Sequence, residues 1–167
     1  AERRAQRANH GLAVRARHVE IDDAEVGLPD VPFGDELIAR DLHVVAAHAA
    51  LRRRTVTSRA LLEQTLAHIE RTNPGLGAVA TLDADGARAA ADAADRHLAA
   101  TGKPLGALHG LPMTLKDSLE TKGLRTTCGS PDLSDHVPDR DADTVARLRA
   151  AGAVIVGKTN VPVMCQD

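Results

Sequence analysis

The sequence predicts an α/β fold, in which helices cover a sheet of short strands. Two patterns predict it: apolar residues recur at helical spacing in several stretches, and short apolar runs of strand-forming residues lie between them. When helices and strands alternate along a chain, the strands form a common sheet and the helices pack on it. The length of 167 residues is sufficient for one ordinary domain.

A polar extension is predicted to precede this domain. Residues 1–34 are polar and end in a run rich in glycine and proline. We interpret them as an N-terminal extension of low order, and residues 35–167 as part of a single domain. The first helix is predicted from Asp35, where leucine, isoleucine and valine begin to recur at spacings of one, three and four.

Capping and turn residues define the next elements. The threonine and serine at 57–58 can cap a second helix, which the sequence Asn-Pro-Gly at 73–75 is expected to stop. Residues 78–82 are a short apolar run that we interpret as a buried strand. Asp83 is then a plausible N-cap for an alanine-rich helix that Gly102 closes.

The second half of the domain is predicted to contain two strands and one helix. Residues 111–115 are strand-like, and a long polar connection rich in glycine and proline follows them. Asp141 or Asp143 is the expected cap of the next helix, which ends at Gly152. Residues 153–156, Ala-Val-Ile-Val, then form a short buried strand.

Residues 152–159, GAVIVGKT, match the phosphate-binding pattern G-x-x-x-x-G-K-[ST]. We interpret them as a strand instead. The four central residues are the strongest strand formers in the chain, whereas a phosphate-binding loop needs a turn there, followed by a helix. Pro162 disfavours a helix at that point. No nucleotide is therefore expected to bind at this segment.

Composition limits the classes of function. The net charge is −2 and both signs are mixed along the chain, while one Phe and no Tyr or Trp leave no aromatic platform for stacking bases. We therefore expect no nucleic-acid partner. No apolar run reaches the ~18 residues of a membrane span, and the arginine-rich start lacks the apolar core of a secretory signal. We expect a cytoplasmic protein with no membrane partner, no cofactor and no metal.

Lys116 is the first candidate for a chemical role. The large apolar residues Leu111, Met113 and Leu115 alternate along a strand that runs into Lys116, and a period of two places the lysine on the opposite face. In an internal strand such an ammonium group enters a low-dielectric site, where burial lowers the pKa of a lysine from about 10.4. A neutral amine can act as a general base. The alternative is a strand-end lysine that reaches water.

Residues 104–130, PLGALHGLPMTLKDSLETKGLRTTCGS, resemble the lysine segment of the amidase signature family. They share a Gly-x-Pro start, a short apolar strand, Lys-Asp and a Gly-x-x-Thr-x-x-Gly-Ser turn. Residues 141–162, DADTVARLRAAGAVIVGKTNVP, resemble the next helix and strand of the family and its Gly-Lys-Thr-Asn-x-Pro turn. Upstream elements follow in the same order, so that the resemblance covers roughly residues 36–167.

The resemblance implies an amidase that hydrolyses carboxamide C–N bonds of small linear amides. Lys116 would accept a proton from a serine held on a cis peptide bond, which relays it from the nucleophilic serine of an acyl-enzyme. The implied fold is a central mixed sheet covered by helices, incomplete in this chain. The glycine-rich segments that carry both serines are absent, so we expect them beyond residue 167 and expect no activity from this chain alone.

Several nearby residues are candidates for supporting roles. Gly129 and Ser130 lie in a turn that the family places near the lysine, although a plain turn is the alternative. A minimal serine–lysine dyad through Ser118 and a nitrilase-type nucleophile at Cys128 are further alternatives that the sequence favours less. His109 is interpreted as a loop residue or as lining of a substrate channel.

Asp117 follows Lys116 directly, and a carboxylate in contact with the amine would oppose a neutral base. We therefore predict that Asp117 points away from Lys116 and makes structural contacts. Two other readings of the chain stay open: an amidotransferase A-type subunit of tRNA-dependent amidation, which needs partner subunits, and a non-catalytic truncated remnant. Exposed sheet edges and apolar surface also predict homo-oligomers or other association.

Overall fold

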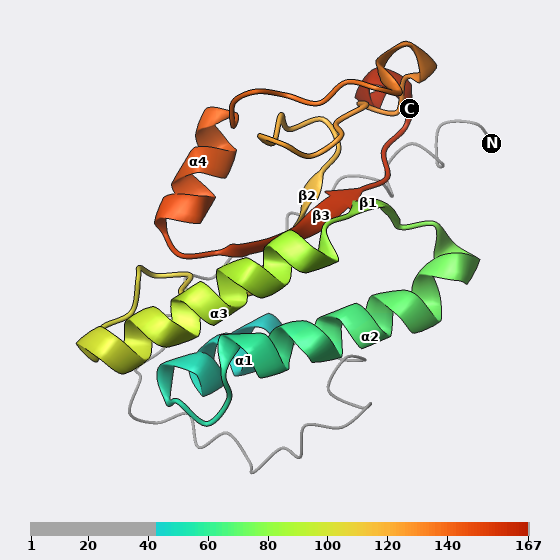
Figure 1. The fold of residues 1–167 in the computed structure, drawn as a ribbon. Coiled ribbons are helices and arrows are strands. Elements are labelled where there is room, and N and C mark those ends of the chain that lie inside the picture. Colours follow the sequence, from blue (N-terminus) through green and yellow to red (C-terminus); the bar gives the residue numbers. More distant parts are fainter. Residues whose placement is uncertain (1–42, 167) are drawn as a thin grey trace, which may run out of the picture. The chain divides into compact units, whose positions relative to one another are not determined.

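A computed structural model of the chain describes residues 43–166, in which helices and strands alternate as predicted (Figure 1). The elements are α1 (His43–Arg52), α2 (Ser58–Leu76), β1 (Val79–Leu82), α3 (Ala84–Thr101), β2 (Pro112–Lys116), the short 3-10 helix η3 (Pro131–Leu133), α4 (Asp143–Ala150), β3 (Val154–Thr159) and the short 3-10 helix η4 (Val163–Cys165). The predicted extension at 1–34 and the start of the first helix at Asp35 lie outside the described residues.

The three strands form one mixed sheet with the order β1-β3-β2. The central strand β3 pairs antiparallel with β1 and parallel with β2. In the parallel pair, Leu115 lies opposite Lys158 and Lys116 lies opposite Thr159. This arrangement confirms the mixed sheet that the family resemblance implied. It also confirms that most of the GAVIVGKT segment is strand, but β3 (Val154–Thr159) continues three residues beyond the predicted end at Val156.

Helices cover both faces of the sheet, and alternate residues of β3 face the two layers. On one side α2 and α3 run side by side and bury the cluster Leu62, Leu66, Ala87, Ala91, Val154 and Val156 (Figure 1). On the other side α4 packs with Leu115, Val145, Ala153 and Ile155. The helix α1 packs through Ala47 and Leu51 against α2. The buried alanines of α3, Ala87 and Ala91, let this helix approach β3 closely.

Three predicted caps are confirmed. The Thr57 side chain accepts a hydrogen bond from the Ala60 N–H at 3.0 Å, and Asp83 accepts one from the Gly86 N–H at the same distance. These bonds satisfy backbone donors that the first turn of a helix leaves free. Gly102 closes α3 in the left-handed conformation, with φ of 68°, as its lack of a Cβ permits.

The predicted end of α2 at residues 73–75 is wrong. The helix includes Pro74 and continues to Leu76, and Gly77 rather than Gly75 adopts the left-handed conformation. The Asn73 side chain explains the longer helix, because it accepts a hydrogen bond from the Val79 N–H at 2.7 Å and donates one to the Val79 carbonyl. Asn73 therefore joins the last turn of α2 to β1.

Two further predictions need correction. Neither Asp141 nor Asp143 caps α4: the N-cap is Ala142, without a side-chain bond. Asp141 instead accepts a hydrogen bond from the Lys122 N–H at 2.7 Å, which ties α4 to the preceding loop. The strand β1 is half-buried rather than buried, because it lies at the edge of the sheet.

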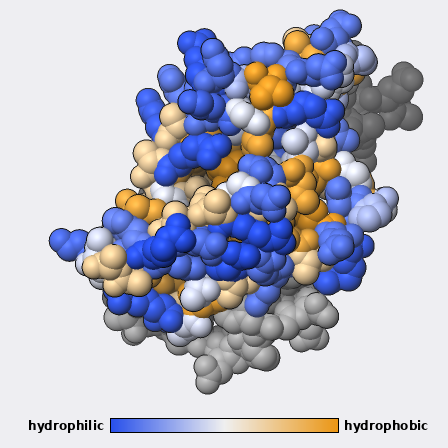
Figure 2. Space-filling model, in the orientation of Figure 1, coloured by the Kyte–Doolittle hydropathy of each residue, from blue (hydrophilic) through white to orange (hydrophobic). Residues whose placement is uncertain are grey.

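The outer surface over α2 and α3 is mainly hydrophilic (Figure 2). Its charges form a network: Glu63 lies 2.7 Å from Arg59 and 2.8 Å from Arg88, and Arg59 also pairs with Asp92. No helix within residues 43–166 is long and apolar enough to cross a membrane.

Candidate active site

Lys116 is the last residue of β2, at the edge where the carboxyl ends of β2 and β3 lie together. The Asp117 N–H extends this pairing with a 3.1 Å hydrogen bond to the Thr159 carbonyl. The predicted alternation is seen only at the end of the strand, where Leu115 is buried and Lys116 is exposed, whereas residues 112–114 are all half-buried. Burial of Lys116 was expected only if its strand is internal. Among the described residues this condition is not met, because β2 is an edge strand of their sheet.

Three other polar groups lie near Lys116. The Sγ atoms of Cys128 and Cys165 are 3.8 Å apart, and both thiols are free. A hydrogen bond with Ser118 is the main cause that lowers the pKa of the Cys165 thiol, with further contributions from Cys128 and Lys116 against the effect of burial. Ser118, Cys165 and Lys116 therefore form one polar group at the end of β2.

Cys128 is a poor candidate for a nucleophile. Burial is the main cause that raises the pKa of its thiol, and the hydrogen bond with Cys165 acts in the same direction. Because the thiolate is the nucleophilic form, these causes oppose a nitrilase-type role. Residues 43–166 contain no group of three His, Cys, Asp or Glu side chains that could hold a metal ion.

Asp117 makes structural contacts, as predicted. Its side chain is only 2% exposed. One carboxylate oxygen, Oδ2, accepts hydrogen bonds from the Thr127 N–H at 3.0 Å and from the Thr127 hydroxyl at 2.5 Å. The Asp117 carbonyl accepts another from the Cys128 N–H. Asp117 thereby joins the beginning of the loop after β2, residues 117–130, to the part of this loop around Thr127.

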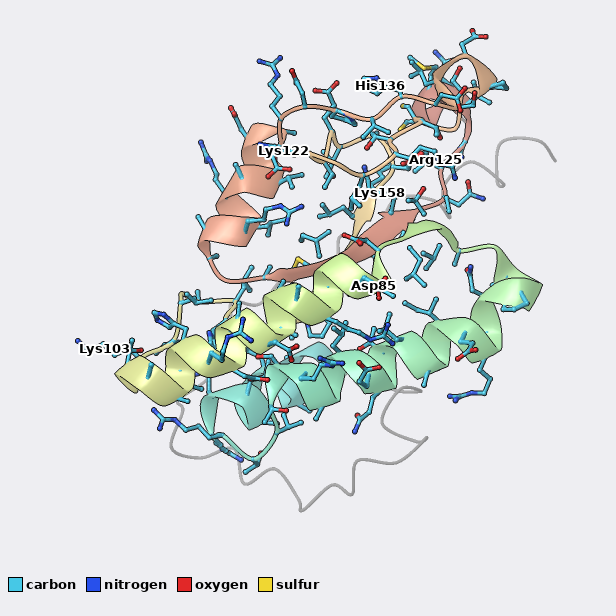
Figure 3. All side chains as sticks on the ribbon, in the orientation of Figure 1. Asp85, Lys103, Lys122, Arg125, His136 and Lys158 are labelled. Atoms are coloured by element: carbon cyan, nitrogen blue, oxygen red, sulfur yellow. The ribbon has the colours of Figure 1, made fainter. Side chains whose placement is uncertain are left out.

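Lys158, which sequence reasoning had not selected, is the buried lysine of this region. It is fully buried in β3 and donates hydrogen bonds to the Leu119 carbonyl at 2.5 Å and the Thr126 hydroxyl at 2.8 Å. Its Nζ lies 3.8 Å from Oδ1 of Asp117. Figure 3 places Lys158 beneath the loop that carries Lys122 and Arg125. Burial lowers the pKa of Lys158, and the Asp117 carboxylate opposes this effect.

The two candidate supporting residues, Gly129 and Ser130, occupy a tight turn. Gly129 has φ of 69°, and a Cβ at this position would lie 2.5 Å from the Val161 carbonyl oxygen. The close approach accounts for glycine here. Ser130 precedes η3 and makes no capping bond through its side chain. The turn is also held by a 2.7 Å hydrogen bond from the Met164 N–H to the Cys128 carbonyl.

His109 is a buried loop residue. Its Nδ1 accepts a hydrogen bond from the Leu105 N–H at 3.1 Å, and burial lowers the pKa of the imidazole. It lines a pocket of about 450 Å³ together with His48 and Leu51, and Lys116 is not part of this lining. The loop interpretation of His109 therefore holds, whereas its role in a substrate channel stays a prediction.

Comparisons with known proteins agree with the resemblance. A family model described as Amidase matches residues 60–166. The A-type subunit of the glutamyl-tRNA(Gln) amidotransferase of Geobacter sulfurreducens is 47% identical over 125 residues, which are 75% of this chain and 25% of that protein. The corresponding protein of a Roseiflexus species is 48% identical over 115 residues, or 68% of this chain and 23% of that protein. This chain thus spans about a quarter of the length of the curated relatives it matches.

Solved structures give the same result. A crystal structure of an amidase is 36% identical with a TM-score of 0.64, and the match covers 72% of this chain and 27% of that one. A bacterial aryl acylamidase of the amidase signature enzymes is 27% identical with a TM-score of 0.66, over 72% of this chain and 25% of that one.

Proposed function

This chain belongs to the amidase signature family, and we propose that it supplies the general base, Lys116, of a site that hydrolyses carboxamide C–N bonds. The observation that carries the proposal is the position of Lys116. The lysine of the family segment ends an ordered strand and is exposed beside the buried Leu115, next to Ser118 and Cys165. An amine in this position can accept a proton from a group that approaches the end of the sheet.

The proposed reaction uses two serines from outside the present sequence. Lys116 accepts a proton from the serine on the cis peptide bond, and this serine takes the proton of the nucleophilic serine. The nucleophilic oxygen then attacks the amide carbonyl carbon, the C–N bond breaks, and the amine leaves with a proton. Water hydrolyses the acyl-enzyme and releases the acid. The contacts of Asp117 with Thr127 and Lys158 support this role, because they direct its carboxylate to groups other than the Lys116 amine.

We propose a small linear amide as the substrate. The relatives favour a second candidate, the A-type subunit of a tRNA-dependent amidotransferase, because two matched proteins of that kind are 47% and 48% identical to this chain. In that role the same lysine would take part in releasing ammonia from an amide donor, and partner subunits would use the ammonia. The two candidates share the base and differ in the acceptor of the amine.

The test uses the complete source polypeptide, assayed against aryl amides, aliphatic amides and glutamine. Replacing Lys116 by Ala should lower kcat/KM by about 100- to 10,000-fold, the usual contribution of a general base. The matched control is Lys122→Ala, which removes an exposed lysine of the following loop. Wild-type activity in Lys116→Ala would refute the proposal. Glutamine hydrolysis that requires co-purified subunits would favour the amidotransferase, and a complete polypeptide inactive on every amide would favour a remnant.

A further inference from the structure

We propose that Lys158 is a positioning residue for Lys116, which holds the loop after β2 in place and balances the charge of Asp117. This inference rests on the proposed function of Lys116 as the base. Lys158 cannot contact the reacting atoms itself, because its side chain is fully buried among residues of the same domain.

The contacts of Lys158 explain how it positions the loop. An ammonium group has three protons to donate. Two of them bond the Leu119 carbonyl and the Thr126 hydroxyl, and the third side of the group faces Asp117. These partners lie at the start and at the far end of the loop that leaves β2. Since Lys158 is also paired with Leu115 across the sheet, it connects the loop directly to the strand that carries Lys116.

The charge of Lys158 has a second effect, on Asp117. Thr127 satisfies Oδ2 of this buried carboxylate, but Oδ1 has no hydrogen-bond partner within the described part of the chain and faces only the Lys158 ammonium. A buried charge is costly unless another charge balances it. If Lys158 were neutral, the negative charge would remain beside Lys116, the next residue in sequence, and would favour its protonated form.

The titratable groups near the end of β2 show that the charges of Asp117 and Lys116 lie in one small region. Besides Asp117 and Lys158, the thiols of Cys128 and Cys165 lie near the end of β2. Burial and the bond to Cys165 are the main causes that raise the pKa of Cys128, but the Asp117 charge also raises it and the Lys116 charge lowers it. The electric fields of Asp117 and Lys116 therefore overlap at one side chain.

A structural role alone does not require a charged residue here. A neutral side chain with N–H donors could bond Leu119 and Thr126 without the loss of hydration that a buried ammonium suffers. Burial indeed lowers the pKa of Lys158. The proposal explains the charge by the carboxylate that it balances, and it predicts an effect on catalysis that a packing role would not produce.

The experiment measures kcat/KM as a function of pH for the complete protein and its Lys158→Gln variant. Glutamine keeps N–H donors for Leu119 and Thr126 but removes the charge. The acid limb of the profile should move to higher pH by about one unit, the usual effect of an uncompensated neighbouring charge. Adding Asp117→Asn, which retains an oxygen to accept from Thr127, should return the limb to its wild-type position.

An unshifted acid limb in folded Lys158→Gln would overturn the proposal, even if activity falls. So would a shift that persists in the double variant. If Lys158→Gln does not fold, recovery of folding on adding Asp117→Asn supports the charge balance, and a double variant that stays unfolded contradicts it. Lys116→Ala separates this inference from the proposed function: an active Lys116→Ala removes both, whereas an inactive one with an unshifted Lys158→Gln limb removes only the positioning role.

Discussion

Two groups of opposite charges hold different parts of this molecule, and they differ in their access to water. On the helix pair, Glu63 joins Arg59 and Arg88, and all three side chains are about 40% exposed. Under the loop after β2, Lys158 is fully buried and the Asp117 side chain is 2% exposed. The helix pair is scaffold, whereas the loop borders the candidate base. The free energy needed to separate the charges should therefore differ greatly between the exposed network and the buried pair.

The difference follows from hydration. When an exposed pair is broken, water solvates both partners, and the net loss of stability is small. A buried partner left alone keeps an uncompensated charge in a medium of low dielectric. The exposed network should therefore tolerate substitution, while the pair beneath the loop should not. This contrast locates the structural constraint at the candidate site rather than in the helix pair.

The largest expected effect comes from removing the buried cation. Lys158→Ala should lower the free energy of unfolding by about 3–5 kcal/mol, because it leaves Asp117 unpaired and opens a cavity. Lys116→Ala is the matched control and should change it by no more than about 0.5 kcal/mol, since that side chain is exposed. Urea denaturation of the complete protein measures both. Equal destabilisation by the two variants would remove the contrast between the lysines.

A smaller effect is expected at two glycines of the same loop. Gly123 and Gly129 both have positive φ, so alanine at either position should cost about 1–2 kcal/mol for the left-handed conformation. Gly129→Ala should cost more than Gly123→Ala, because only at Gly129 would the new Cβ meet the carbonyl oxygens of Val161 and Pro162. Thermal unfolding of the two variants compares them. The opposite order would mean that the turn at Gly129 can move without loss.

The smallest effect is expected in the exposed network, and it depends on pH. The bonds from Arg88 and then Arg59 lower the pKa of Glu63 from 4.5 to about 2. A depressed carboxyl pKa stabilises the folded state above pH 4.5, and this contribution is lost as the pH falls from 4.5 towards 2. Glu63→Gln should therefore be slightly less stable than wild type at pH 7, with a difference that vanishes near pH 2.

High salt should also reduce that difference, because salt screens exposed charges. Urea titrations of both proteins at pH 7 and at pH 2.5, with and without added salt, provide the check. A difference that is large or insensitive to salt would contradict the assignment of this network to the scaffold.

Local signals in the sequence predicted much of the fold. Thr57, Asp83 and Gly102 act at helix ends through bonds with residues close in sequence, and their roles were therefore predictable. The alternation of Leu115 and Lys116 depends only on the strand period. The family motif then identified Lys116 as the candidate base. That assignment stays a prediction, because it depends on the two serines that the family mechanism requires.

The features that sequence reasoning missed depend on distant partners. Lys158 bonds Leu119 and Thr126, which are 39 and 32 residues away, and periodicity alone cannot reveal such contacts. The predicted cap of α4 was wrong for a similar reason, because the backbone N–H of Lys122, in the preceding loop, donates a hydrogen bond to the Asp141 carboxylate. The available signal was a lysine two residues after the buried strand run at 153–156, together with an aspartate after Lys116. It indicated a buried pair only once the two strands were known to be neighbours.

The position of β3 has a consequence for the order of folding. This central strand is the last strand of the described chain, and it pairs residues as far apart as Val79 and Thr159. Pairing between distant segments is slow, whereas α2 and α3 are close in sequence and can associate early. During synthesis, the apolar faces of α2 and α3 therefore stay exposed until β3 has left the ribosome. Chaperones that bind exposed apolar helices would act in this interval, before the sheet is complete.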